Sequence, residues 1–346
     1  MTRRQWLAAT TFLKAIPGWR YEFPRDHFSH PAFRTEWWYY TGNVADAQGR
    51  PFGFELTFFR AALAESVERR NVWSTRDAYM AHLALTDIAG KAFYHSERLN
   101  RPGPGLAGVD AARGRIWNGN WESLVQPEAH RLRAVAEKFS FALDLAVAKP
   151  PVIHGHGGVS QKGPLAGQAS HYISFTRLEA GGEIVLGAER FRVRGTAWMD
   201  HEFFSSELDE KLAGWDWFSI QLDNREELML YRLRQKDGAA SPWSAGSYVR
   251  ADGRIEHLEA AELELEPGRK WKNYPVAWRV RVKRLGIDLL AEPRLDSQEL
   301  LSKAKLTPSY WEGAMVFRGS HRGLGYLEMT GYDDRVLFTR REGVRK

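Results

Sequence analysis

The chain has 346 residues, enough for about two domains that can each bury a core without disulfides or metal ions. It contains no Cys, which excludes disulfides, thiolate metal sites and a Cys nucleophile. The net charge is +6, but Lys and Arg are interleaved with Asp and Glu and form no basic arm, so we expect no nucleic-acid partner.

The first residues resemble a shortened export signal. Arg3 and Arg4 precede an apolar stretch at residues 6–13, but no small-x-small cleavage site follows. A signal remnant and a short helix or frayed tail both remain open, and we treat residues 1–20 as a tail. No apolar run approaches the ~20 residues that a membrane-spanning helix needs.

Further along, apolar and polar residues alternate with a period of two, which is typical of antiparallel sheets with one buried face. Asp223-Asn224-Arg225 separates two such runs and predicts a hairpin. Helical patterns are confined to residues 61–69 and 296–303. The clearest alternating segments are residues 53–59, 139–145, 171–177 and 277–282.

Many short strands with Gly-rich turns predict an all-β fold of the barrel or sandwich type. The chain exceeds the roughly 200–250 residues of one such domain, so we expect two antiparallel domains packed together, with few short helices. We place the boundary near residue 205, which gives an N-terminal domain at 21–205 and a C-terminal domain at 206–346. The 14 Trp suit strands or the wall of a ligand pocket.

Three ionisable residues, Asp200, His201 and Glu202, stand in a row among aromatic residues. On a strand, Asp200 and Glu202 share one face and His201 takes the other. Aromatic surroundings favour the protonated carboxyl, which makes a plausible general acid. The alternative is a solvated strand end.

A second candidate is Glu36 with Trp38 and Tyr40, which share one face of a strand, while Trp37 and Tyr39 lie on the other. The carboxylate could hold the polar end of a ligand whose apolar body lies on the rings. The alternative is a core strand with a structural Glu paired to an Arg, for example Arg34 or Arg60.

Other chemistry finds little support. His171 opens an apolar strand face, where a lone His is more often a satisfied core residue than a catalyst. His154 and His156 have metal-ligand spacing but no assignable third ligand, and the same holds for Asp26, His27 and His30, so we expect no metal and no cofactor. The serine-hydrolase elbow, the phosphate loop and the His-Glu-x-x-His motif are absent.

Several strings carry a family resemblance, from about residue 20 to about 335: EWWYYTGN (36–43), AWMDHEF (197–203), GWDWFSIQL (214–222), NYPVAW (273–278), YWEGA (310–314) and GYLEMTGY (325–332). They resemble the AttH family of predicted secreted hydrolases, which is related to carotenoid 1,2-hydratases and fungal lipocalin-like hydratases. The resemblance implies two lipocalin-like domains with a ligand pocket in or between them.

The resemblance also implies roles for particular residues. The acid of the hydratase relatives falls on Asp200, its His partner on His171 and a cation-stabilising aromatic on Trp198. A second aromatic of that pattern falls on Ile173, a departure that puts carotenoid hydration in doubt. We add His201, Glu202 and Trp217 to Glu36, Trp38 and Tyr40 as ligand-binding candidates.

Three functions follow from these readings. The first is a cofactor-independent hydratase or isomerase acting on a small apolar, lipid-like or isoprenoid-like molecule. The second is a non-catalytic carrier associated with ABC transporter components, in line with the naming of AttH. The third is a hydrolase, which would need a Ser such as Ser205 or Ser206 near His171 or His201. Relatives usually carry an export signal, so the resemblance implies a periplasmic or secreted protein, and no oligomeric state follows from the sequence.

Overall fold

The computed structural model describes residues 12–63, 75–206, 209, 211–302 and 309–332. Nearly all regular structure in this part of the chain is β-strand, as predicted. None of the described helices is long and apolar enough to cross a membrane. The helices within the described ranges are four single turns of 3-10 type: η1 (Arg25–His27), η2 (Ala111–Arg113), η3 (Ala260–Glu262) and η4 (Lys283–Leu285).

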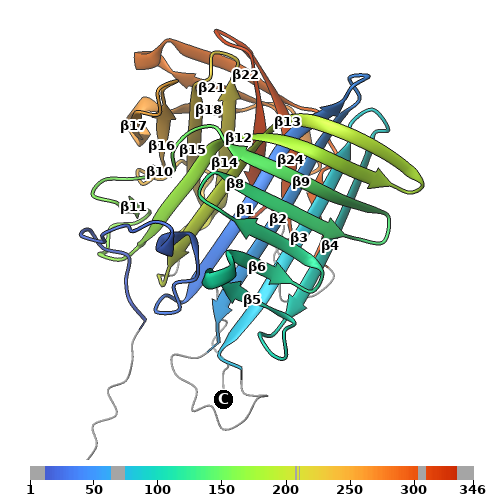
Figure 1. The fold of residues 1–346 in the computed structure, drawn as a ribbon. Helices are drawn as coiled ribbons and strands as arrows, with labels where there is room; N and C mark the ends of the chain where they lie inside the picture. The colour runs from blue at the N-terminus through green and yellow to red at the C-terminus, as the bar shows by residue number, and fades with distance from the viewer. Residues whose placement is uncertain (1–11, 64–74, 207–208, 210, 303–308, 333–346) are drawn as a thin grey trace, which may run out of the picture.

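The first sheet is antiparallel and curls into a nearly closed barrel (Figure 1). Its order is β4-β3-β2-β1-β13-β12-β9-β8-β7-β6-β5, and β10 and β11 also pair with β12. The two ends of the sheet approach each other where the Arg98 guanidinium of β4 donates to the Asn118 carbonyl of β6 over 2.8 Å. Its strands are β1 (Thr35–Asp46), β2 (Pro51–Ala62), β3 (Asp77–Asp87), β4 (Ala92–Asn100), β5 (Ala107–Asp110), β6 (Arg115–Asn118), β7 (Trp121–Val125), β8 (Ala129–Val135), β9 (Phe139–Val147), β10 (Val152–Ile153), β11 (Ser160–Gln161), β12 (Ala169–Leu186) and β13 (Glu189–Phe204).

The second sheet is also antiparallel and curls into a half-barrel that faces β1, β2, β12 and β13. Its order is β17-β16-β15-β14-β25-β24-β22-β21-β18, with β23 beside β24. The segment between Phe204 and Leu212 joins the two sheets. A domain boundary near residue 205 stays a prediction. The strands are β14 (Leu212–Leu222), β15 (Glu227–Gln235), β16 (Ala245–Val249), β17 (Ile255–Glu259), β18 (Glu264–Pro267), β21 (Trp278–Val282), β22 (Ile287–Pro293), β23 (Glu299–Leu300), β24 (Tyr310–Gly319) and β25 (Gly323–Met329), and β19 (Lys270–Trp271) pairs separately with β20 (Tyr274–Pro275).

The alternating segments form β2, β9, β12 and β21 as predicted, and β14 and β15 form the predicted hairpin. The helix predicted at residues 296–303 is wrong as far as residue 302, because Glu299 and Leu300 pair with β24 as β23 and the Gln298 carbonyl accepts from the Glu312 amide, so tertiary pairing overrides helix propensity. Of the other predicted helix, residues 61 and 62 belong to β2 and residues 64–69 lie outside the described residues.

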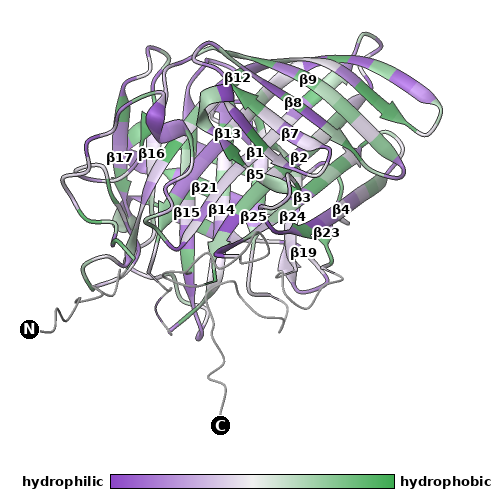
Figure 2. Ribbon diagram, turned by 60° about the horizontal axis from the view of Figure 1, so that its bottom comes forward, coloured by the Kyte–Doolittle hydropathy of each residue, from purple (hydrophilic) through white to green (hydrophobic). Residues whose placement is uncertain are grey.

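Strand β1 is buried on both faces. Trp38 and Tyr40 point into the barrel, where a core of aromatic and aliphatic side chains surrounds them. Tyr39 points the other way and packs with Trp217 and Tyr326 of the second sheet. Figure 2 shows hydrophobic and hydrophilic segments in turn along the strands of both sheets. The space between the sheets is therefore a second interior, distinct from that of the barrel.

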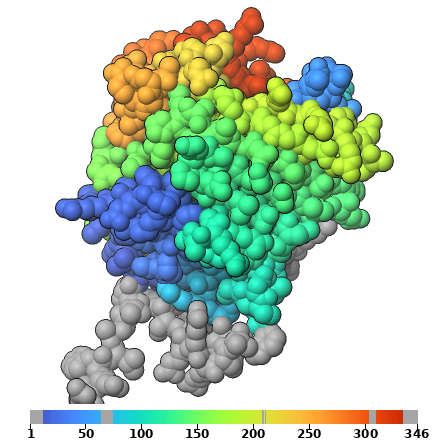
Figure 3. All heavy atoms as spheres, viewed as in Figure 1, coloured from blue at the N-terminus to red at the C-terminus, as the bar shows by residue number. Residues whose placement is uncertain are grey.

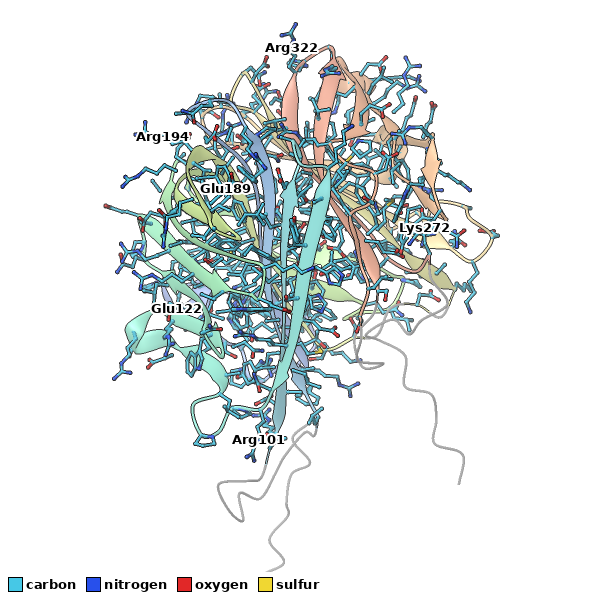
Figure 4. The ribbon with its side chains drawn as sticks, turned by 90° about the vertical axis from the view of Figure 1, so that its right-hand side faces the viewer. Arg101, Glu122, Glu189, Arg194, Lys272 and Arg322 are labelled. Atoms are coloured by element: carbon cyan, nitrogen blue, oxygen red, sulfur yellow. The ribbon has the colours of Figure 1, made fainter. Side chains whose placement is uncertain are left out.

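The N-terminal segment, blue in Figure 3, packs against one end of β12 and β13, on the face that lines the barrel farther along these strands. Phe33 packs there with Ile173 and Phe203, and Trp19 closes the cluster. Charged side chains such as Arg101, Glu189 and Arg322 lie on the periphery of different parts of the molecule (Figure 4).

Candidate active site

A cavity of about 120 Å³ lies between the two sheets. This is close to the ~150 Å³ of a cavity that accommodates one benzene ring, so it admits a ring or a thin chain. Its first wall comes from β1, β2, β12 and β13, and its second wall comes from β14, β15, β24 and β25. Nine of its lining residues are aromatic: Trp37, Tyr39, Phe59, Tyr172, Phe204, Trp215, Trp217, Tyr231 and Tyr310.

Asp200 of β13 lines this cavity and is 3% exposed. Its Oδ1 accepts hydrogen bonds from Ser174 Oγ and, over 2.6 Å, from Trp198 Nε1. Its Oδ2 accepts from the Tyr172 hydroxyl over 2.7 Å, and that hydroxyl accepts from Trp217 Nε1 over 2.9 Å. The carboxyl is thus held in one orientation by three side-chain donors.

Burial raises the pKa of Asp200 to about 7, and the charge of Glu202 adds to the shift. The three hydrogen bonds oppose burial because they stabilise the carboxylate. A carboxyl with this pKa carries its proton in roughly half of the molecules at pH 7. It is therefore suited to donate a proton inside an aromatic cavity.

The rim beside Asp200 is charged. Lys162 forms an ion pair with Glu202, and Ser170 bonds both of them. The Lys162 ammonium also lies 5.4 Å from the centre of the Tyr172 ring and 5.3 Å from that of Tyr231. Because the two charges neutralise each other, this rim suits a polar but uncharged group of a ligand.

The second wall brings another acid. Glu328 of β25 lines the cavity and accepts a hydrogen bond from Trp215 Nε1 over 2.9 Å. Burial raises its pKa to about 8, with a contribution from the charge of Glu55. Behind the cavity, Tyr39 donates to Glu312 over 2.6 Å, and Tyr310 donates to Glu55 over 3.0 Å. This end of the cavity thus consists of phenols and of carboxyls whose pKa values are raised by burial.

We expect Glu328→Gln to raise the free energy of unfolding by roughly 2–5 kcal/mol at about pH 9 and to change it little at about pH 5. A carboxyl whose pKa rises from 4.5 to about 8 on folding contributes stability that is complete below pH 4.5 and is lost as the pH rises through about 8. Gln cannot ionise, so the variant avoids this loss. Urea unfolding at both pH values measures the effect, with the exposed Glu128→Gln as control. The prediction would be contradicted if the free energy of unfolding changed equally with pH in Glu328→Gln and in the wild type.

Some of the predicted site residues face the cavity, and the others lie on the opposite face of their strands. Asp200, Glu202 and Trp217 line the cavity, and Trp198 lies directly behind Asp200. The remaining candidates lie on the opposite face of their strands, outside the cavity: Glu36, Trp38, Tyr40, His171 and His201. On β1 the cavity receives Trp37 and Tyr39 instead. Both faces of this strand are apolar and buried, so alternation separates the two sets but does not say which one meets a ligand.

His171 does not orient Asp200. Its Nδ1 lies 3.1 Å from the Gly158 carbonyl and 3.2 Å from the Tyr21 hydroxyl, under the N-terminal segment. Burial lowers its pKa. The orienting role falls to its neighbour Tyr172, which points to the cavity because successive residues of a strand alternate between faces.

The serines considered for a hydrolase make other contacts among the described residues. Ser205 Oγ accepts from the Arg34 amide over 3.1 Å, and Ser206 Oγ contacts the Ala169 carbonyl at 3.5 Å. Neither contact involves His171 or His201. Sequence reasoning also missed Tyr172 and Glu328; an acid on an apolar strand, as in GYLEMTGY, is the signal that could have indicated Glu328.

Glu36 instead forms a buried ion-pair network. Its Oε1 lies 2.8 Å from His30 Nδ1 and 2.9 Å from His201 Nε2, and its Oε2 accepts from Arg60 Nε over 3.1 Å. His30 Nε2 also lies 3.0 Å from Asp26 Oδ1. Burial alone would favour the neutral forms of both groups. The hydrogen bonds from His30 to Asp26 and Glu36 nevertheless raise the pKa of His30. The hydrogen bonds from His201 and His30 hold the pKa of Glu36 well below its usual value.

His30, Glu36 and His201 are metal-ligand types, and one ligand atom of each lies within 4.8 Å of the others. However, both His nitrogens already bond the same Glu36 oxygen, and the Arg60 guanidinium supplies the balancing positive charge. These donors fit a satisfied ion-pair network rather than a metal centre. The network ties the N-terminal segment to β1, β2 and β13.

Fold and site together define an all-β protein of two lipocalin-like sheets, with a buried acid in an aromatic cavity between them. The chain belongs to the AttH-like family, whose model matches residues 14–332. It is similar to the crystal structure of an AttH protein from Nitrosomonas europaea, with 34% identity, a TM-score of 0.83, and 93% of this chain and 100% of that chain covered. It shares the fold of kievitone hydratase from Nectria haematococca at 13% identity and a TM-score of 0.67, covering 90% and 92% of the two chains. No curated protein sequence matches it.

Proposed function

We propose that this protein is a cofactor-independent acid catalyst that hydrates or isomerises a carbon–carbon double bond in a small, uncharged and largely apolar molecule. The observation that carries the proposal is the buried Asp200, held by three donors in an aromatic cavity with its pKa raised to about 7. Because kievitone hydratase shares the fold, hydration is the first reaction to test.

In the proposed reaction Asp200 transfers its proton to one alkene carbon, and the π electrons form the new C–H bond. The positive charge left on the other carbon would lie near the faces of Tyr39 and Trp217, whose ring centres are 5.2 Å apart. In hydration, water adds to this carbon and its surplus proton passes to the Asp200 carboxylate. In isomerisation, the cation loses a neighbouring proton to the same carboxylate. Either cycle regenerates the acid.

Isotope labelling tests the proposal. The protein would be incubated with neutral prenylated and terpenoid alkenes in deuterated, ¹⁸O-labelled water, followed by mass spectrometry. A hydratase introduces both carbon-bound deuterium and ¹⁸O, whereas an isomerase introduces deuterium alone. Binding of these alkenes without incorporation of either label would support the carrier, and ¹⁸O in the products of ester cleavage would support the hydrolase. Either of these two results would overturn the proposal.

A further inference from the structure

A chain of hydrogen bonds leads from Asp200 away from the cavity. Ser174 of β12 donates to Asp200 Oδ1, and His154 Nε2 lies 2.7 Å from Ser174 Oγ. On its other side, His154 Nδ1 lies 2.8 Å from Ser247 Oγ of β16. All four side chains are buried, and His154 bridges the two sheets through its two ring nitrogens.

The far end of this chain approaches the surface. Ser247 is directly opposite His257 in the pairing of β16 with β17. The His257 ring is half-buried, and its Nδ1 has no hydrogen-bond partner among the described residues. Its centre lies 4.8 Å from that of His156, which is exposed and bonds Glu259 over 2.7 Å. Polar groups thus continue from the buried acid to solvent.

His154 can occupy this position in two neutral forms. When Asp200 is ionised, His154 Nε2–H donates to Ser174, and Ser174 donates to the carboxylate. When Asp200 carries its proton on Oδ1, all donors reverse: Asp200 donates to Ser174, Ser174 donates to Nε2, and Nδ1–H donates to Ser247. Burial lowers the pKa of His154 to about 3, so the ring stays neutral, and its two hydrogen bonds are compatible with either tautomer.

We propose that Ser174, His154 and Ser247 form a proton relay that connects Asp200 to solvent at the outer edge of the second sheet. The relay rests on the proposed function, because it serves Asp200 as the acid. For each proton delivered, Ser174 passes its proton to Asp200 and takes one from His154 Nε2. His154 Nδ1 then takes the Ser247 proton, and Ser247 regains one from water near His257. One solvent proton enters, one reaches Asp200, and only the His154 tautomer differs.

In this relay Ser174, His154 and Ser247 position Asp200 and transfer protons, and they do not contact the substrate. In hydration, the proton released by the added water can leave on the face of the substrate that is opposite Asp200. The relay would then return a proton to the Asp200 carboxylate. Several other ionisable groups face Asp200 or His154: Tyr39, Lys162, Tyr172, Glu202, His257, Glu312 and Glu328.

The tautomer of His154 provides a direct test that needs no substrate. The chain has 11 His, so ¹⁵N-His labelling of the full-length protein gives a small set of imidazole signals, with His154 identified by loss of its signals in His154→Gln. ¹³C-Asp labelling would follow Asp200 in the same titration from about pH 5 to about pH 9. We expect Nε2–H to gain population severalfold over Nδ1–H as Asp200 ionises, without His154 becoming charged.

Variants and an internal reference sharpen this test. Ser174→Ala removes the link, so His154 should no longer respond while Asp200 still titrates. Ser123→Ala, a buried Ser that bonds Tyr40 within the barrel, should leave the response intact. His130 bonds the same Tyr40 and should keep one tautomer throughout.

The outcomes separate the two proposals. If Asp200 titrates in this range while the His154 tautomer stays constant in the wild type, the relay is overturned and the acid stands. If Asp200 does not titrate in this range, the proposed function falls, and the relay with it.

Discussion

Asp200→Asn is expected to lower turnover about 10²- to 10⁴-fold, the usual contribution of a positioned general acid. Asn has nearly the same size and retains an oxygen that can accept from Ser174 and Trp198, but it carries no acidic proton. The cavity walls do not depend on the carboxyl proton, so ligand affinity should change by no more than about threefold. Initial rates with a substrate found by isotope labelling, together with calorimetric binding of the same molecule, measure the two effects separately.

Glu202→Gln is the matched control, because Glu202 lies two residues away on the same cavity-facing side of β13. It pairs with Lys162 at the rim, so its substitution should alter affinity more than turnover. In the wild type, kcat/KM should fall above pH about 7, because the protonated form of Asp200 is the acid. Full turnover in Asp200→Asn, or a rate that rises through pH 7, would refute this role.

Arg60→Met is expected to lower the free energy of unfolding by about 3–5 kcal/mol, because it leaves the buried carboxylate of Glu36 without its cation. Arg60 is 1% exposed and donates to Glu36, to Asp77 over 3.0 Å, and to the carbonyls of His30 and Phe33 over 3.0 and 2.7 Å. Met fills similar volume but makes none of these bonds. Equilibrium urea unfolding near neutral pH measures the loss.

The exposed pair of Arg279 with Asp288 provides the control for Arg60. Both side chains are about half exposed, so Arg279→Met should cost less than about 1 kcal/mol. If Arg60→Met were as mild as Arg279→Met, the network around Glu36 would not hold the N-terminal segment in place. If Zn²⁺ stabilised the wild type strongly against urea, the grouping of His30, Glu36 and His201 would be a metal site after all.

The amino-acid sequence was sufficient to predict the strands and several relations within them. Alternation along a strand depends only on local backbone geometry, so β2, β9, β12 and β21 could be read directly. The same rule correctly separated Asp200 and Glu202 from His201, and Trp38 from Tyr39. The family was recognisable from strings such as EWWYYTGN, which are long and rich in Trp.

Tertiary structure alone decided where the cavity lies and what surrounds the acid. Both faces of β1 and of residues 197–203 of β13 are buried, one in the barrel and one against the second sheet, so hydrophobicity cannot tell the cavity face from the core face. Packing of the second sheet against the first selects Trp37 and Tyr39, and it brings Glu328 to the cavity of Asp200 across 128 residues of chain. His154 meets Ser247 only because β16 lies beside the loop that carries it, and a contact between distant segments leaves no periodic signal in either one.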